Sequence, residues 1–288
     1  MELLVEARNA AVPHNIRRVE AHELARSKKP NQLCPDVWLL QSSFRFLHIF
    51  NIGLNGLVLR FERDGNSLLV LLNPPSLTPE VRAQISAIEV ETNAKVEVIL
   101  SPGDWHHLQL PSAVAAFPDA RLYVASDRNV RKQTALKGRA TVLDRFSPRI
   151  SEVGDDLVLL PWLGFSMDSM PWLLSGEPRG AARIEFVVFH RPSGTLFITD
   201  HFFPPEQGKP LKPNTGGFKL QDSTAAKASA RSVLELPVHR AVFSHGQAPA
   251  CVLQDNARSV LKAAYENLLA SHHVSGPLEL GLETGSRH

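Results

Sequence analysis

Short apolar runs bounded by turn residues dominate the chain after Asp36, and this pattern predicts strands. The first three predicted strands cover residues 37–46, 56–61 and 67–72. The run Leu68 to Leu72 is continuously apolar, which is typical of a strand buried on both faces. The dipeptide Pro74-Pro75 ends it, and Thr78 followed by Pro79 is a favourable helix start. A strand followed by a helix is therefore predicted here.

Strands and helices then alternate along the chain. Apolar residues recur at helical spacing after Pro79, and the chain returns to a predicted strand over 96–100. The same kind of unit is repeated through a helix near 113–117, a strand over 121–125 and a helix-like segment over 128–136. The second half is similar, with predicted strands over 157–160, 184–190, 195–199 and 241–243 and helices over 225–236 and 257–269. This order favours a layered α/β domain with two sheets between helices.

The two ends of the chain differ from its centre. Residues 1–35 have no apolar core behind a basic start and carry acidic residues among the arginines, so neither a secretory signal nor a transit peptide is predicted. We expect a polar arm over 1–35, partly helical around 19–25, then one domain over 36–273. Residues 274–288 are predicted to form a flexible tail. The interpretation is of a cytoplasmic protein.

Composition narrows the classes of function. The chain has 288 residues, 43% of them hydrophobic and 21% charged, which excludes wholesale disorder. No apolar stretch approaches the roughly 18 residues of a membrane-spanning helix. The net charge of +2 gives no broad electrostatic reason to bind nucleic acid or a membrane, so a small-molecule substrate is the expected partner. Only Cys34 and Cys251 are present, which excludes a disulfide scaffold.

Potential metal ligands follow three of the predicted strands. The strand over 96–100 leads into Asp104, His106 and His107, the strand over 195–199 into Asp200, and the strand over 241–243 into His245. In α/β sheets the ligand site lies beyond the carboxyl ends of the strands. Histidine is also the commonest metal ligand. We therefore expect a site where these three strands end.

The segments ILSPGDWHHLQL, GTLFITDHFF and AVFSHG resemble the motifs of the metallo-β-lactamase superfamily. The resemblance covers roughly residues 37 to 272. In that family the main motif is T-H-x-H-x-D-H, followed later by a separate His, a strand-end Asp and a final His. The resemblance implies a four-layered αββα sandwich with metal ligands on loops along one edge.

The main motif is altered in this chain. With Ser101 on the Thr, Pro102 and Asp104 fall on the first two His, and His106 and His107 fall on the Asp and the third His. No histidine lies between His107 and His190 to supply the separate ligand. The resemblance therefore implies that the first of two metal sites is lost. Candidates for the other are His106, His107, Asp200 and His245, which suit zinc or, with open positions, iron.

We expect from this a metal-dependent hydrolase with one metal ion, in which Asp104 orients a water or acts as general base. A metal-free relic, held together by hydrogen bonds, is an open alternative, as is a wrong register. A non-catalytic binding or scaffold protein and a non-hydrolytic iron-dependent enzyme are the other functional hypotheses. The substrate and the oligomeric state are left open.

Overall fold

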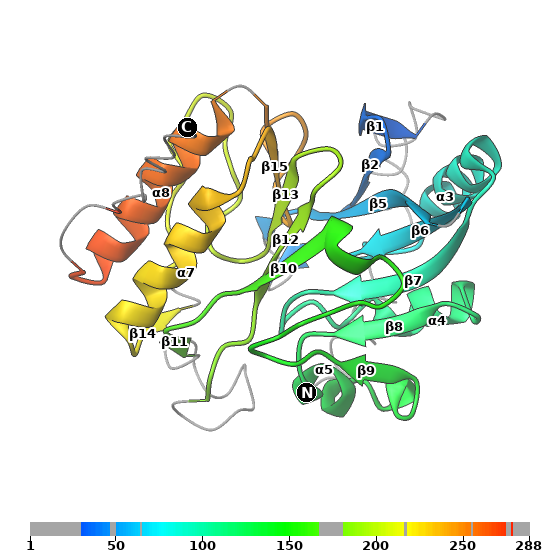
Figure 1. Cartoon of the computed structure of the whole chain (residues 1–288), viewed down its shortest axis with the longest axis horizontal. Helices are drawn as coiled ribbons and strands as arrows, with labels where there is room; N and C mark the ends of the chain where they lie inside the picture. Colours follow the sequence, from blue (N-terminus) through cyan, green and yellow to red (C-terminus); the bar gives the residue numbers. More distant parts are fainter. Residues whose placement is uncertain are drawn as a thin grey trace, which may run out of the picture.

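Two β-sheets lie face to face, and helices cover the outer face of each (Figure 1). This computed structural model describes residues 30–46, 50–63, 65–166, 181–215, 218–254, 256–274 and 278. Buried apolar side chains fill the space between the sheets and the space under each helical layer. The predicted αββα sandwich is confirmed.

The larger sheet has seven strands and comes from the first half of the chain. Its order is β1 (Asn31–Cys34), β2 (Val37–Ser42), β5 (Leu54–Arg63), β6 (Asn66–Leu72), β7 (Lys95–Ser101), β8 (Arg121–Val124) and β9 (Ala140–Val142). Strands β6 to β9 are parallel and the others antiparallel. Its helices are α3 (Pro79–Thr92), α4 (Leu110–Ala116) and α5 (Asp127–Lys132), and the 3-10 turn η1 (Thr134–Leu136) follows.

The smaller sheet has five strands and comes from the second half. Its order is β10 (Leu157–Pro161), β12 (Phe186–His190), β13 (Thr195–Ile198), β15 (Arg240–Phe243) and β16 (Val252–Leu253). Helices α7 (Ser223–Glu235) and α8 (Ala257–Ser271) cover it. Among the described residues, the other elements are the pairs β3 (Arg45–Phe46) with β4 (Phe50–Asn51) and β11 (Phe165–Ser166) with β14 (Lys219–Leu220), and the 3-10 turn η2 (Gly154–Asp156).

Local chemistry explains where the helices begin. The Thr78 side chain accepts a hydrogen bond from the Val81 amide at 3.4 Å, and Pro79 occupies the first turn of α3, as predicted. Helix α7 begins two residues before its predicted start because Asp222 caps it. The Asp222 carboxylate accepts from the amides of Thr224 and Ala225 at 2.9 and 3.0 Å.

Two predicted elements are broken in the structure. The strand over 37–46 divides after Ser42, whose partner in β5 is Leu54. The residue before Leu54 is Gly53, whose φ of +64° turns the partner strand away, so pairing stops there. The helix over 128–136 divides into α5 and η1 because Gln133 between them has the non-helical angles φ −130° and ψ 85°.

The predicted arm and tail both contribute to the domain. Strand β1 begins at Asn31 and pairs with β2, so the last residues of the predicted arm belong to the sheet. Val274 and Leu278 of the predicted tail are buried beside α7 and α8. The helix predicted around 19–25 lies outside the described residues.

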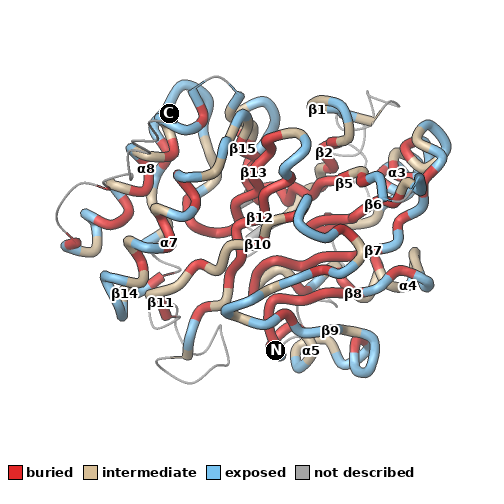
Figure 2. The backbone as a smooth tube through the Cα atoms, in the orientation of Figure 1, coloured by how far each residue is buried: buried red, intermediate tan, exposed pale blue. Residues whose placement is uncertain are grey.

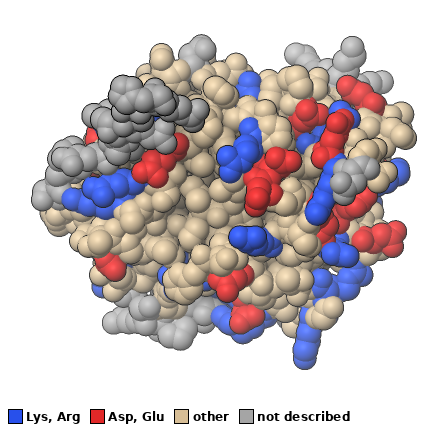
Figure 3. All heavy atoms as spheres, in the orientation of Figure 1, with Lys and Arg blue, Asp and Glu red and all other residues tan. Residues whose placement is uncertain are grey.

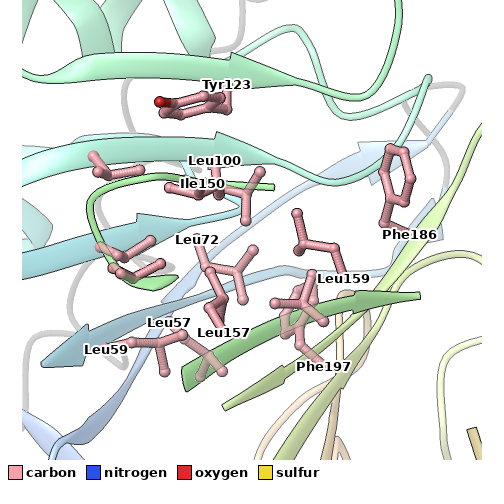
Figure 4. Close-up of a cluster of buried hydrophobic side chains, with 14 of the residues drawn as sticks. Leu57, Leu59, Leu72, Leu100, Tyr123, Ile150, Leu157, Leu159, Phe186 and Phe197 are labelled. Atoms are coloured by element: carbon pink, nitrogen blue, oxygen red, sulfur yellow. The ribbon is translucent and has the colours of Figure 1, made fainter. Parts of the chain in front are cut away.

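The side chains between the two sheets are buried and mostly apolar, as expected for a sandwich. Figure 2 shows that the strands are buried along most of their length. On the face drawn in Figure 3, basic and acidic side chains are interspersed. Figure 4 shows Leu57, Leu72 and Leu100 from the larger sheet facing Leu159 and Phe197 from the smaller one. Among the described residues, no helix is both long and apolar enough to span a bilayer.

The buried His190 at the end of β12 leads to a prediction about pH. Its Nδ1 atom lies 2.7 Å from Ser193 Oγ, and its ring packs edge-on against Phe61. Burial lowers the pKa of His190, although Asp36 and Asp156 oppose the shift. The unfolded chain therefore binds a proton below about pH 6.5 that the folded chain rejects, so stability is lost as the pH falls.

We expect His190→Gln, which keeps a hydrogen-bonding side chain without a titrating group, to make this loss shallower. The difference in free energy of unfolding between the two proteins should change by up to about 1.4 kcal/mol per pH unit below pH 6.5. Urea unfolding at pH 7.5, 6 and 5, with chelator present throughout, measures it. Parallel pH profiles for the two proteins would contradict the prediction.

Candidate metal centre

The parallel pairing of β13 and β15 places two of the predicted ligands side by side. Ile198 at the end of β13 is in register with Phe243 at the end of β15. Asp200 and His245 each come two residues after these paired positions. The Ser244 amide donates to the Ile198 carbonyl at 2.9 Å and continues the pairing. The two ligands therefore leave the sheet at the same level and toward the same edge.

His106 reaches the same place from the larger sheet. It lies in a turn after β7, in which its amide donates to the Gly103 carbonyl at 3.3 Å. The Ser101 hydroxyl donates to the His106 carbonyl at 2.6 Å. These two bonds fold the chain back at the end of the strand and direct His106 toward the smaller sheet.

Two imidazoles and one carboxylate converge at this edge. One ligand atom from each of His106, Asp200 and His245 lies within 4.8 Å of the other two. The Nε2 atoms of both histidines lie 3.1 Å from the same oxygen, Asp200 Oδ1. Ligand atoms around a metal bound at about 2.0 to 2.2 Å lie roughly 3 to 4 Å apart. The spacing therefore matches what a metal ion requires.

Main-chain contacts fix the orientation of His245. Its Nδ1 atom donates to the Gly53 carbonyl at 2.7 Å, which leaves Nε2 toward Asp200. Asn55 Nδ2 donates to the carbonyls of Phe243 and Gly246 at 2.9 and 3.0 Å, and the Gly246 amide donates to Ile52. The start of β5 thus holds the loop that carries His245.

This orientation tests whether the residues suit a metal. A neutral imidazole that donates from Nδ1 has a lone pair at Nε2. In His245 that lone pair faces a carboxylate oxygen at 3.1 Å, and two electron-rich atoms at this distance need a proton or a metal cation between them. Metal binding displaces such protons. The three side chains therefore fit a metal ion.

The pKa values of these groups show how strongly they interact. Burial alone would raise the pKa of Asp200, but the imidazoles of His106 and His245 outweigh burial and hold it well below its usual range. Burial would lower the pKa of His245, but the contact with Asp200 reverses the shift and raises it. Without a metal, the carboxylate is ionised and His245 retains its proton more strongly than usual.

The second oxygen of Asp200 faces a buried arginine. Arg183 donates from Nη2 to Asp200 Oδ2 at 2.8 Å and lies 2.7 Å from Glu185 Oε1. Arg183 is 2% exposed and Glu185 1% exposed, so water does not reach either side chain. Burial raises the pKa of Glu185 to about 8, although Arg183 opposes the shift.

The other two predicted site residues lie outside this cluster. His107, also predicted as a ligand, directs Nδ1 to the Asp104 carbonyl at 3.2 Å, and burial, with the charge of Arg128, lowers its pKa to about 4. The Asp104 carboxylate accepts from the Ser126 hydroxyl and, at 2.8 Å, from the Ile184 amide. Both its oxygens are engaged, which favours a role in holding the loop over the predicted role of general base.

Sequence reasoning missed Arg183, Glu185, Asn55 and Gly53. Arg183 and Glu185 did carry a signal, because two charged residues alternate with apolar ones just before a buried strand. A polar residue such as Asn55 within an apolar strand is also a signal of a buried hydrogen bond. The role of Gly53 left no comparable signal, because it is the main-chain carbonyl of Gly53 that accepts the hydrogen bond from His245.

Comparisons with known proteins give a likeness in structure alone. No family model matches the chain, and no curated protein matches it. The mono-zinc form of the metallo-β-lactamase FIM-1 from Pseudomonas aeruginosa is similar over 84% of this chain and 95% of its own, at 14% identity and a TM-score of 0.54. A metallo-β-lactamase from Pontibacter korlensis is similar over 83% and 98%, at 15% identity and a TM-score of 0.54. One from Erythrobacter litoralis is similar over 83% and 91%, at 13% identity and a TM-score of 0.52.

Proposed function

Because this chain has the metallo-β-lactamase fold and brings two imidazoles and a carboxylate together at its edge, we propose that it is a metal-dependent hydrolase with one metal ion. The ligands would be His106, Asp200 and His245, and zinc is the proposed metal. The single observation that carries the proposal is the convergence of both Nε2 atoms on Asp200 Oδ1 at 3.1 Å.

The donor set suits hydrolysis. When bound, a zinc ion with three protein ligands and an open position polarises a carbonyl oxygen and lowers the pKa of a bound water toward neutrality. The chain supplies the orientation, since Gly53 fixes the tautomer of His245 and Arg183 fixes the Asp200 carboxylate. The Phe44 ring lies 6.1 Å from the His245 ring and provides an apolar wall beside the site.

The substrate proposed is a small molecule with a hydrolysable carbonyl or ester bond. The interspersed charges of Figure 3 and the net charge of +2 favour this over a nucleic acid or a membrane surface. Hydrolysis of a broad range of β-lactams is not proposed, since Pro102 and Asp104 stand where the family resemblance places two histidines.

Metal content tests the proposal. Protein purified without chelator should contain close to one equivalent of zinc by elemental analysis. His245→Ala should lose it, because the variant lacks one of three ligands. His239→Ala is the matched control, because it removes an exposed histidine that directly precedes β15. This variant should keep its zinc. Hydrolysis of a panel of esters, thioesters and lactones should follow zinc content across the three proteins.

Other outcomes would favour the other hypotheses. Wild-type protein with no metal and no activity would support a binding or scaffold protein. Iron in place of zinc, together with consumption of oxygen, would support the non-hydrolytic iron-dependent enzyme.

A further inference from the structure

The Asp200 carboxylate lies between two cationic environments. Its Oδ1 atom lies 3.1 Å from the Nε2 atoms of His106 and His245. These three atoms surround the proposed metal position. Its Oδ2 atom accepts from Arg183 Nη2 at 2.8 Å on the other side. One carboxylate therefore bridges the proposed metal position and a permanent positive charge.

Arg183 Nη2 lies between two buried acidic side chains. Two carboxyl oxygens, Asp200 Oδ2 and Glu185 Oε1, lie 2.8 and 2.7 Å from it. A second bond, from Arg183 Nε to Glu185 Oε1 at 2.9 Å, prevents rotation of the guanidinium. Its carbon lies 4.7 Å from the centre of the Phe218 ring and 5.4 Å from that of Trp105. The Arg183 guanidinium is thus held by acidic oxygens at its edge and by the rings of Phe218 and Trp105.

The main chain holds this charge in place. Gly103 and Glu185 form an antiparallel bridge, and around it the Asp104 amide donates to Ile184 at 3.1 Å and the Phe186 amide to Pro102 at 2.7 Å. A Cβ atom on Gly103 would lie 2.3 Å from Glu185 Oε2, so the carboxyl group fills the space that a side chain would need. We define residues 102–104 and 184–186 as the seam. Pro102 and Asp104 make hydrogen bonds within the seam and are not among the proposed metal ligands.

We propose that Asp200 and Glu185 form a second cation site whose permanent occupant is the guanidinium of Arg183. Arg183 is a positioning residue that takes the place a second metal ion would have, and it leaves Oδ1 as the Asp200 oxygen available to a metal. The inference deepens the proposed function and rests on it for the first metal, but the Arg183 site is built from protein groups alone.

Removing the guanidinium should open the site to a divalent cation. Arg183→Met keeps an unbranched apolar stem and removes the charged guanidinium. Each protein is loaded with zinc, cleared of excess, and titrated with Mn²⁺ while the free Mn²⁺ is followed by electron paramagnetic resonance. Mn²⁺ prefers carboxylate oxygen, so it probes the Asp200–Glu185 pair.

We expect one additional equivalent of Mn²⁺ in Arg183→Met and none in the wild type. Arg183→Lys, which keeps a positive charge, should bind none. Arg128→Met is the matched control, because Arg128 also stacks on Trp105 but donates to the Asp104 carbonyl. It should bind none as well. Zinc affinity should fall about 10–100-fold in Arg183→Met, since Asp200 loses the partner that orients it, and should be partly restored in the lysine variant.

The outcomes separate this inference from the proposed function. Wild type that takes no zinc, beside Arg183→Met that takes up Mn²⁺, would contradict the function and leave the inference standing. Zinc in the wild type with no Mn²⁺ uptake by folded Arg183→Met would overturn the inference and leave the function standing. If Arg183→Met does not fold, Arg183→Gln is titrated in its place. Two equivalents of metal in the wild type overturn the inference whatever the variants do.

Discussion

Asp200→Ala is expected to abolish metal binding and to lower the free energy of unfolding by about 3–5 kcal/mol, the cost of breaking a buried charge pair. Asp200 is 9% exposed and is contacted by His106, His245 and Arg183. Without it, the Arg183 guanidinium keeps only Glu185 as an acidic partner, and burial raises the pKa of that carboxyl group. Urea unfolding of both proteins in chelator measures the loss that comes from the protein groups alone.

Melting temperatures then report the metal. Wild-type protein should melt well above its chelated form, because a ligand that binds the folded state stabilises it by mass action. That difference should vanish in Asp200→Ala. Asp200→Asn is the matched control, since it keeps the shape of the side chain and one acceptor while removing the charge. It should lose the metal with a smaller loss of stability.

One result would support a metal-free relic. If wild-type protein that was never exposed to chelator melts at the same temperature with and without it, the cluster is held by hydrogen bonds alone. The sandwich core is apolar and independent of the metal, so each of these proteins should still fold.

Asn55→Ala is expected to give the second large effect, at a residue whose side chain hydrogen-bonds to main-chain carbonyls of the His245 loop. Asn55 is fully buried, and its Nδ2 atom donates to two carbonyls of the loop that carries His245. The variant leaves both carbonyls without this donor, at roughly 1–3 kcal/mol each. We expect a loss of about 3 kcal/mol in unfolding free energy and a 10–100-fold loss of zinc affinity, as for other groups that orient a ligand.

Zinc titration and urea unfolding together check this prediction. Asn55→Asp has the same shape but no donor, and it should weaken zinc binding as the alanine does. Ser229→Ala is the control for a lost buried hydrogen bond elsewhere, because Ser229 lies within α7 and its hydroxyl accepts from the Leu163 amide at 3.0 Å. It should lose stability with unchanged zinc affinity. An Asn55→Ala protein that binds zinc as the wild type does would contradict the role assigned to Asn55.

The sequence predicted the strand ends of the site well because each strand is a compact apolar run. The runs before Asp200 and His245 differ in residues but have the same relation to their ligand, and parallel pairing then places both ligands at one edge. The alternation of strands and helices predicted a layered domain with two sheets between helices, and the resemblance implied the αββα sandwich. The order of strands within each sheet was not predicted. These are properties of patterns that extend over many residues.

The sequence predicted both His106 and His107 as ligands, whereas only His106 lies in the cluster with Asp200 and His245. The two histidines are neighbours in a turn, where no strand or helix periodicity shows which way a side chain points. Hydrogen bonds from Ser101 and to Gly103 fold the turn back and orient His106, and they involve main-chain atoms of His106 and Gly103 that the sequence does not display. Arg183 was missed for a related reason. Its partner Glu185 is 2 residues away, but Asp200 is 17 residues away, and the antiparallel pairing of β12 with β13 brings Asp200 back beside Arg183.

The seam also sets a time scale for the site. The amides of Asp104, Ile184 and Phe186 donate across the junction between the two halves of the chain, so their hydrogens can exchange with solvent only when that junction opens. Slow exchange at these three amides would mean that Arg183, Glu185 and Asp104 stay assembled for as long as the protein stays folded. An arriving metal or substrate would then meet a site whose framework is already built.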